Sequence, residues 1–253
     1  MSKKHRPLTD LQWQVIAPLL NLQRKRAHDL REVFNAILFI ARTGVQWCFM
    51  PACYPPMDVV YYYFDLWKKS GLLRKLNLAL NILDRVRVGR PPKPSLLLID
   101  SQSVKLDPRI SEHRGLDAFK KVNGRKRQII TDSEGRIFAV LVHAANLHDG
   151  AQAITMLKER PAWASEAKLV LSDRGYLGRF ADHLKALGIG HQVASRPPSK
   201  KGFVPIAKRW VVERTFAWFA CFRRLTSDRE HTPSSHEAFI LLANISICLN
   251  RMS

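Results

Sequence analysis

The sequence predicts an α/β chain in which a mixed sheet flanked by helices follows an all-helical region. Apolar residues recur at helical spacing through the first part of the chain. After it, short apolar runs typical of buried strands alternate with helical patterns. The 253 residues are 46% hydrophobic and 25% charged, which indicates a globular chain with a large core.

Helices are expected throughout the first part. The stretch "PLTDLQWQVIAPLL" offers Thr9 or Asp10 as its N-cap residue. The stretch "DLREVFNAILFIARTG" has Asp29 as N-cap, Glu32 as the partner in a capping box, and Gly44 as its end. The stretches "MDVVYYYFDLWKKSG" and "LLRKLNLALNILDRV" predict further helices.

The connector "RVGRPPKPS" is basic and rich in proline, which is typical of a link between domains. We therefore predict a helical domain over residues 1–88, a linker over 89–95 and a second domain over 96–253.

The second domain mixes strands with helices. The expected order is the strand "SLLLID", the hairpin "RKRQIITDSEGRIFAVLVHAA", the helix "HDGAQAITMLKE", the strand "AKLVLSD", the helix "GRFADHLKALG", the strand "HQVAS", and helices in "KRWVVERTFAWFACFRRL" and "SSHEAFILLANISICLNRM". This is the order of the RNase H-like fold. In that fold the two buried strands that end in Asp are neighbours, and a late helix packs across them.

Charge and composition indicate which class of partner the chain binds. The chain has 41 Lys plus Arg against 21 Asp plus Glu, a net charge of +20, which predicts a polyanionic partner such as DNA. Its apolar runs are too short to span a bilayer, and its start lacks the apolar part of a signal peptide. The cysteines lack a CxxC pair, so we expect buried free thiols in a cytoplasmic protein.

Three acids stand out by position. Asp100 ends "LLLID", Asp173 ends "LVLSD", and Glu213 is the one acid in a basic, aromatic helix. Singly, each aspartate could begin a turn, and Glu213 could pair with Arg209. Together, on adjacent strands and a covering helix, they predict a site for Mg²⁺, which favours carboxylate oxygens and phosphate. Asp149 is expected to cap its helix, with a place near the metals as the alternative.

Basic residues near these acids are expected to hold DNA phosphates, contacts that position DNA without reading its sequence. The expected residues are Lys120, Lys121, Arg125, Lys126, Arg127, Lys208, Arg209, Arg214, Arg223 and Arg224.

Several longer motifs carry a resemblance to a known family. They are "LTDLQWQVIAPLL", "LREVFNAILFIARTGVQW", "VVYYYFDLWKKSGLLRKLN", "IDSQSVK", "GRKRQIITDSEGRI", "NLHDG", "SDRGYLG" and "RWVVERTFAWFACFRRL". With these, essentially the whole chain resembles the DDE transposases of the insertion-sequence-five group. The resemblance implies an RNase H-like catalytic domain with the triad Asp100, Asp173 and Glu213, and a helical domain over 1–88 that binds transposon ends. Phe119 departs from the family, which commonly has Gly there.

The resemblance further implies a function. The expected protein binds the terminal inverted repeats of an insertion sequence, cleaves with activated water and joins the freed 3′-hydroxyls to target DNA. Its cofactor would be Mg²⁺, for which Mn²⁺ can substitute. We expect a homodimer or larger assembly on DNA, in the bacterial cytoplasm and nucleoid. Two alternatives stay open: a decayed or repurposed DNA-binding protein without catalysis, and an RNase H-like nuclease without strand transfer.

Overall fold

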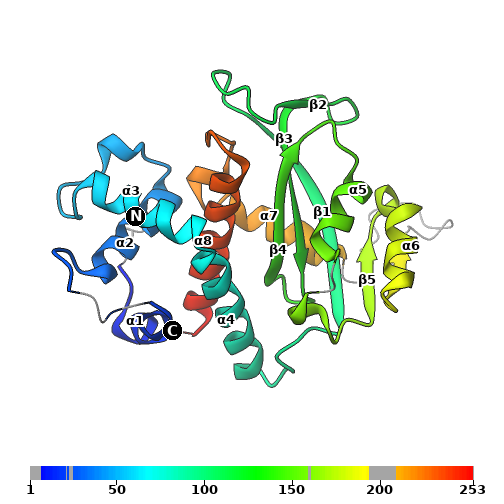
Figure 1. Cartoon of the computed structure of the whole chain (residues 1–253), viewed down its shortest axis with the longest axis horizontal. Coiled ribbons are helices and arrows are strands. Elements are labelled where there is room, and N and C mark those ends of the chain that lie inside the picture. The colour runs from blue at the N-terminus through cyan, green and yellow to red at the C-terminus, as the bar shows by residue number, and fades with distance from the viewer. Residues whose placement is uncertain (1–6, 21, 23–24, 159–160, 194–208, 253) are drawn as a thin grey trace.

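A computed structural model describes residues 7–20, 22, 25–158, 161–193 and 209–252. It shows a helical region beside a mixed sheet that carries helices on both faces (Figure 1). This confirms the predicted α/β class.

The bounds of the elements follow the sequence patterns closely. The first helices are α1 (Asp10–Ile16), α2 (Leu30–Thr43), α3 (Met57–Lys69) and α4 (Leu72–Arg87). The strands are β1 (Leu96–Lys105), β2 (Gly115–Asp117), β3 (Val122–Thr131), β4 (Ile137–Ala144), β5 (Leu169–Ser172) and β6 (Gly190–Val193). The later helices are α5 (Asp149–Leu157), α6 (Arg179–Ala186), α7 (Arg209–Phe219) and α8 (Pro233–Met252). Short 3₁₀ turns are η1 (Ala17–Leu19), η2 (Trp47–Phe49), η3 (Ala162–Ala164), η4 (Arg174–Tyr176) and η5 (Arg223–Leu225).

The sheet has the RNase H-like arrangement. Its strand order is β2-β3-β1-β5-β6, and β4 also pairs with β3. Strand β1 is antiparallel to β3 and parallel to β5, and β5 is parallel to β6. The predicted hairpin is β3 followed by β4, joined by a turn at residues 132–135. Strand β1 therefore lies at the centre, between the antiparallel and parallel halves.

Each face of the sheet contributes to a separate hydrophobic core, because side chains alternate along a strand. Leu98 of β1 and Ile129 of β3 belong to a core that includes α7 and α8. Leu97 and Ile99 of β1 belong to a core with α5 and α6. A residue of β1 can therefore be assigned to one side of the sheet by its position alone.

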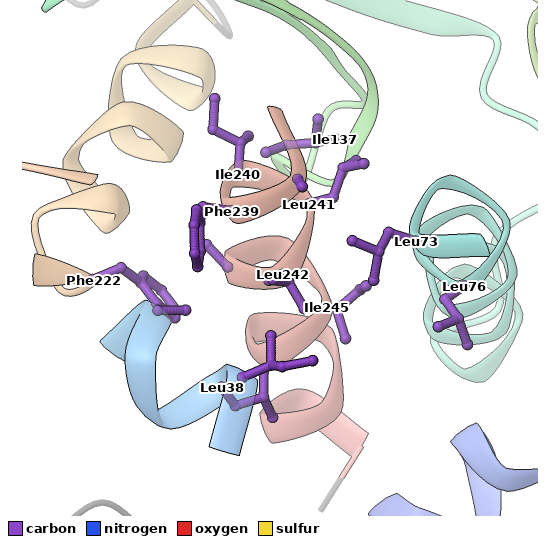
Figure 2. Close-up of a cluster of buried hydrophobic side chains, with 14 of the residues drawn as sticks. Leu38, Leu73, Leu76, Ile137, Phe222, Phe239, Ile240, Leu241, Leu242 and Ile245 are labelled. Atoms are coloured by element: carbon purple, nitrogen blue, oxygen red, sulfur yellow. The ribbon is translucent and has the colours of Figure 1, made fainter. Parts of the chain in front are cut away.

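Helix α8 is the centre of the larger core. Phe239, Leu242 and Ile245 are fully buried along it. Figure 2 shows this cluster between α2, α4, the segment after α7 and the start of β4. The N-terminal helices thus share one core with the sheet, and the members of this core come from both sides of residues 89–95. The predicted division into domains there stays a prediction.

The helix ends agree with the capping residues that the sequence predicts, with one exception. Thr9 caps α1 in a capping box with Gln12, and Asp29 caps α2 by accepting the Arg31 N–H. Gly44 ends α2 with a φ of 70°. Glu32, however, accepts a hydrogen bond from Asn35 (3.2 Å), so the capping box predicted at Asp29 does not form.

Strand β1 also differs from the prediction that it ends at Asp100. It continues to Lys105, because β3 pairs with it as far as the register pair Lys105↔Gly124. Strand β2, which the sequence did not predict, pairs with the start of β3.

Two expectations about the environment of the chain can be compared with the structure. The cysteines were expected to be buried, yet Cys48, Cys53 and Cys221 are exposed and only Cys248 is buried. Within the described residues, no helix combines the length and the apolar character needed to cross a membrane.

Candidate active site

Asp100 and Asp173 lie side by side. The parallel register pairs Leu98 with Leu171, and each aspartate follows its leucine by two residues. The pairing ends at Leu98 and Leu171, and the backbone of Asp173 is still extended. The same register continued by two residues sets Asp173 opposite Asp100, on strands about 4.8 Å apart. By the alternation of side chains, both point to the face that α7 covers. Both are half-buried.

Each aspartate also has a local role. The Oδ1 of Asp173 accepts the Gly175 N–H (2.9 Å) and so caps the η4 turn. The Oδ1 of Asp100 accepts the N–H of Ser101 (2.8 Å). The turn-forming role considered for Asp173 is therefore present in the structure. It occupies one oxygen of a carboxylate that has two, so it is compatible with binding a cation.

Tyr176 lies behind this pair, close to the negative charges of the aspartates. Its ring is fully buried, and its hydroxyl accepts a hydrogen bond from Nε2 of Gln128 (2.9 Å). Burial raises the pKa of Tyr176 well above its usual value, and the negative charges of Asp100, Asp149 and Asp173 raise it further. The phenol therefore stays protonated beside three carboxylates.

Sequence reasoning did not single out Tyr176 or Gln128, which lie behind the aspartates on the face of the sheet with α5 and α6. Gln128 lies in a strand whose first half is polar and charged, so no local pattern marked it as buried. Asp149 starts α5, where His148 is the N-cap residue, and it forms an ion pair with Nζ of Lys126 (3.1 Å).

Glu213 lies on α7, which packs against β1. Its side chain is exposed, whereas Val212 and Thr215 on the same helix are buried. Across the described residues, no group of three or more His, Cys, Asp or Glu is close enough together to hold a metal ion. The structure thus brings Asp100 and Asp173 together and places Glu213 on the helix beside them, without closing the three into one cluster.

Helix α7 is held by the turn of the β3–β4 hairpin. The Thr215 hydroxyl donates to the carbonyl of Gly135 (3.4 Å) and to that of Val211 (2.9 Å). Nη2 of Arg214 donates to the carbonyl of Glu134 (3.1 Å). The position of Glu213 therefore depends on this hairpin turn.

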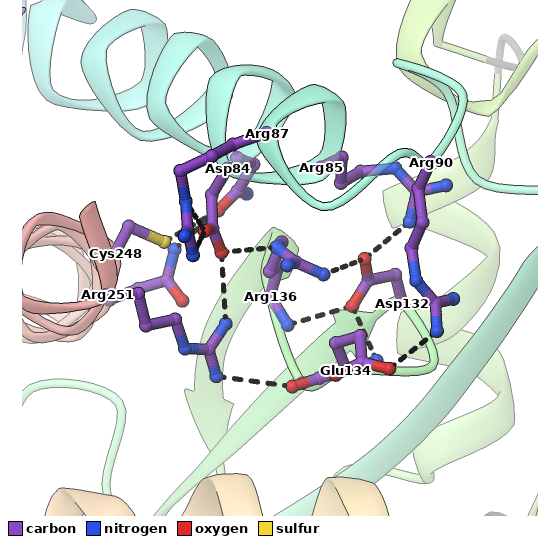
Figure 3. A network of polar contacts seen from close by, with 12 residues as sticks. Asp84, Arg85, Arg87, Arg90, Asp132, Glu134, Arg136, Cys248 and Arg251 are labelled. Atoms are coloured by element: carbon purple, nitrogen blue, oxygen red, sulfur yellow. Dashed lines mark hydrogen bonds and ion pairs between the residues drawn. The ribbon is translucent and has the colours of Figure 1, made fainter.

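The same turn belongs to a buried network of charges (Figure 3). Asp132 accepts hydrogen bonds from Nη1 of Arg85 (2.5 Å) and Nη1 of Arg136 (3.1 Å). Asp84 accepts from Nε of Arg136 (2.7 Å) and Nη1 of Arg251 (3.3 Å). Because these residues come from α4, the hairpin and α8, the network ties the first helices to the turn that supports α7.

The predicted DNA contacts of Arg125, Lys126 and Arg127 conflict with their burial. Arg125 is 0% exposed and pairs with Asp228 (3.0 Å). Arg127 lies over the ring of Phe219 (4.8 Å), and burial lowers its pKa to about 10. All three lie in the middle strand of the antiparallel half of the sheet, where helices or loops cover both faces. Their burial contradicts the prediction that they line a DNA path.

The basic residues near α7 divide in the same way. Arg224 is buried and pairs with Glu230 (2.6 Å), which takes it off the surface. Arg214 is partly buried between the rings of Trp210 (4.5 Å) and Trp218 (4.6 Å). The exposed members of the predicted set are Lys120, Lys121 and Arg223. Lys208 and the side chain of Arg209 lie outside the described residues.

The donor atoms of the site suit a divalent cation. Asp100 and Asp173 supply carboxylate oxygens, which Mg²⁺ prefers as ligands. Two adjacent carboxylates also repel one another, and a cation between them removes that repulsion.

The central β1, antiparallel to β3 on one side and parallel to β5 on the other, with helices on both faces, defines the RNase H-like class of proteins. Within that class, residues 91–249 match the family described as "Transposase DDE domain", and the chain belongs to this family. Residues 8–77 match the family described as "Putative transposase of IS4/5 family". Domains of the DDE family use divalent metal ions.

One curated relative gives a direct comparison. It is named "Putative transposase for insertion sequence element IS402", from Burkholderia cepacia, and is 33% identical to this chain over 137 residues. The match covers 51% of this chain and 64% of the relative.

Proposed function

We propose that this chain is the transposase of an insertion sequence, which binds the terminal inverted repeats, cleaves the DNA strands and transfers them to a target. The observation that supports this proposal is the parallel pairing of β1 with β5, in which Leu98 and Leu171 are partners two residues before Asp100 and Asp173, together with the packing of the Glu213 helix against β1. A protein that only binds DNA has no need of adjacent carboxylates facing phosphates.

In this proposal, Asp100 and Asp173 bind the divalent cations, and Glu213 completes the site when α7 and DNA are in place. Bound Mg²⁺ or Mn²⁺ stabilises charge on the attacking and leaving oxygens of a phosphoryl transfer. Lys120, Lys121 and Arg223 are exposed and would neutralise backbone phosphates. Residues 1–88 would bind the transposon ends, and two copies would be needed to hold two ends together.

The test is cleavage and strand transfer on labelled duplexes that carry the DNA flanking the gene. Wild type and Glu213→Gln are compared with Mg²⁺ and with EDTA. We expect the variant to bind DNA but to cut about 10²–10³-fold more slowly, since it loses charge stabilisation in the transition state. Glu166→Gln removes an exposed glutamate just before the start of β5 and is the control.

Each other outcome selects a different function. If Glu213→Gln cuts at the wild-type rate, Glu213 is a counter-ion and the proposed triad is wrong. Wild type that binds the ends without cutting them is a DNA-binding protein without catalysis. Wild type that cuts but never joins is a nuclease of the same fold.

A further inference from the structure

The turn between β2 and β3 presents an aromatic side chain to solvent. Phe119 is 95% exposed, the highest value among the exposed large hydrophobic residues that the structure describes. Lys120 and Lys121 follow it and are also exposed. No Asp or Glu occurs between Asp117 and Asp132, and the exposed charges next to the ring are those of Lys120 and Lys121.

The turn is held in one conformation. The Oδ1 of Asp117 accepts the backbone N–H groups of Phe119 (3.1 Å) and Lys120 (3.0 Å). Its Oδ2 accepts the hydroxyl of Ser103 from β1 (2.5 Å). Lys121 has a φ of 53°, in the left-handed region, which closes the turn tightly. Phe119 is thus exposed on a turn that hydrogen bonds hold in place.

The turn also lies close to the paired aspartates. Nζ of Lys120 donates to the carbonyl of Ser101 (3.4 Å), the residue that follows Asp100 on β1. The amino group of Lys120 therefore lies within reach of a DNA strand bound at this part of β1, and Phe119 is the residue before it.

We propose that Phe119 is a wedge that inserts into DNA next to the phosphate to be cut and unstacks the adjacent base step. The proposal rests on the proposed function. Proteins that distort duplexes insert apolar side chains between base steps while basic groups hold the neighbouring phosphates. Phe119 with Lys120 and Lys121 has this combination on a fixed turn. The positive charge of the segment favours DNA over a protein partner as the occupant.

The wedge can be tested with 2-aminopurine, whose fluorescence rises when it leaves the base stack. The probe is placed at successive positions around the cut in a duplex carrying the DNA that flanks the gene. Wild type should raise the fluorescence at one or two positions, and Phe119→Ala should not. Phe119→Trp should retain the effect, because its ring can still stack. Leu116→Ala removes another exposed apolar residue of the same hairpin (57% exposed) and is the matched control.

Cleavage gives a second readout. Phe119→Ala should cut the paired duplex about tenfold more slowly, as expected for a lost stacking contact. A mismatch at the wedge position should restore most of that rate, because the step is then already unstacked. A defect in folding would not be rescued by a change in the DNA.

Three outcomes overturn the wedge while the proposed function stands: wild type that cuts without any rise in fluorescence, Phe119→Ala that matches wild type, and Phe119→Ala that alters only the oligomeric state. The last would make Phe119 a contact between protein copies. If wild type neither binds nor cuts the duplex, the proposed function fails and the wedge fails with it.

Discussion

Asp84 shows how much one buried carboxylate can organise. Its side chain is 0% exposed and is surrounded by the guanidinium groups of Arg87, Arg136 and Arg251. Burial alone would raise the pKa of Asp84, but the hydrogen bonds from Arg87 and Arg136 lower it below its usual value. Asp84 is therefore charged in the native state at neutral pH.

We expect Asp84→Asn to lower the free energy of unfolding by about 3–5 kcal/mol, since it leaves buried arginines without their counter-charge. A carboxyl whose folded pKa is depressed stabilises the protein above its unfolded pKa of 3.8 and loses that contribution as the pH falls. The difference between wild type and variant should be constant from about pH 5 to 8 and shrink below about pH 4. Urea unfolding at each pH measures it.

The control for this prediction is Glu166→Gln, which changes an exposed acid and should leave stability within about 0.5 kcal/mol of wild type. A loss of less than about 1 kcal/mol for Asp84→Asn would show that the arginines find other partners.

At this scale the sequence indicated the acids better than the arginines. Asp100 and Asp173 could be placed because each lies at the end of a strand-like stretch, "LLLID" and "LVLSD", that can be read from the local sequence. Whether Arg125 faces DNA or the core depends on Asp228, which lies 103 residues further along the chain. No local pattern contains that partner, so a run of basic residues looked like a surface.

Among the elements, α7 is the one whose placement matters most for the site, and Gly135 lets it approach the hairpin. Gly135 has a φ of +83°, and a Cβ there would lie 2.5 Å from Oγ1 of Thr215 and 3.2 Å from the ring of Trp218. Both of those residues belong to α7. A methyl group would therefore push the helix that carries Glu213 away from the turn.

We expect Gly135→Ala to lose about 1–3 kcal/mol of stability and also to cut DNA more slowly than wild type. Gly89→Ala is the matched control: its φ is +71°, yet nothing lies within 4 Å of its added Cβ. It carries the backbone strain without the clash, so it should lose stability and keep its cutting rate. If the two variants, both measured as folded protein, cut DNA at the same rate, then the cutting rate does not depend on the position of α7.

Element boundaries were predictable where a cap or glycine sets them, as at Thr9, Asp29 and Gly44. They were not predictable where pairing sets them. The second half of β1 stays extended because β3 lies beside it, and β2 exists because the start of β3 offers it an edge.

The net charge of the whole molecule, +20, overstates the surface available to DNA, because several arginines are internal. The salt dependence of binding counts the phosphates that are actually neutralised. We expect Lys120→Gln with Lys121→Gln to reduce the slope of log affinity against log salt by about 0.9 per lysine. Lys168→Gln is the control. This exposed lysine comes just before the start of β5, whereas Asp173 follows the end of that strand.

Titrations of the flanking duplex at several salt concentrations give the slopes. An unchanged slope in the double variant would place the β2–β3 turn away from the DNA path, and would count against the wedge as well.

The large-scale organisation was predicted as helices, a linker and a sheet domain. The shared core was not, because the sequence of α8 shows only that it is apolar and does not show which elements surround it. Leu38 of α2 and Leu73 of α4 reach the same cluster as Ile137 of β4, and long-range packing of this kind leaves no local signal.

Because of this shared core, the first helices are synthesised well before the helix that they pack against. Helices α2, α3 and α4 leave the ribosome early, but the helix that fills the space between them and the sheet is α8, which is synthesised last among the described elements. At roughly 5–20 residues per second, the interval is on the order of ten seconds. For that time α2, α3 and α4 can pack only on one another and on β4, and the apolar faces that contact α8 stay uncovered. The nascent chain is therefore open to chaperones and to aggregation until α8 emerges.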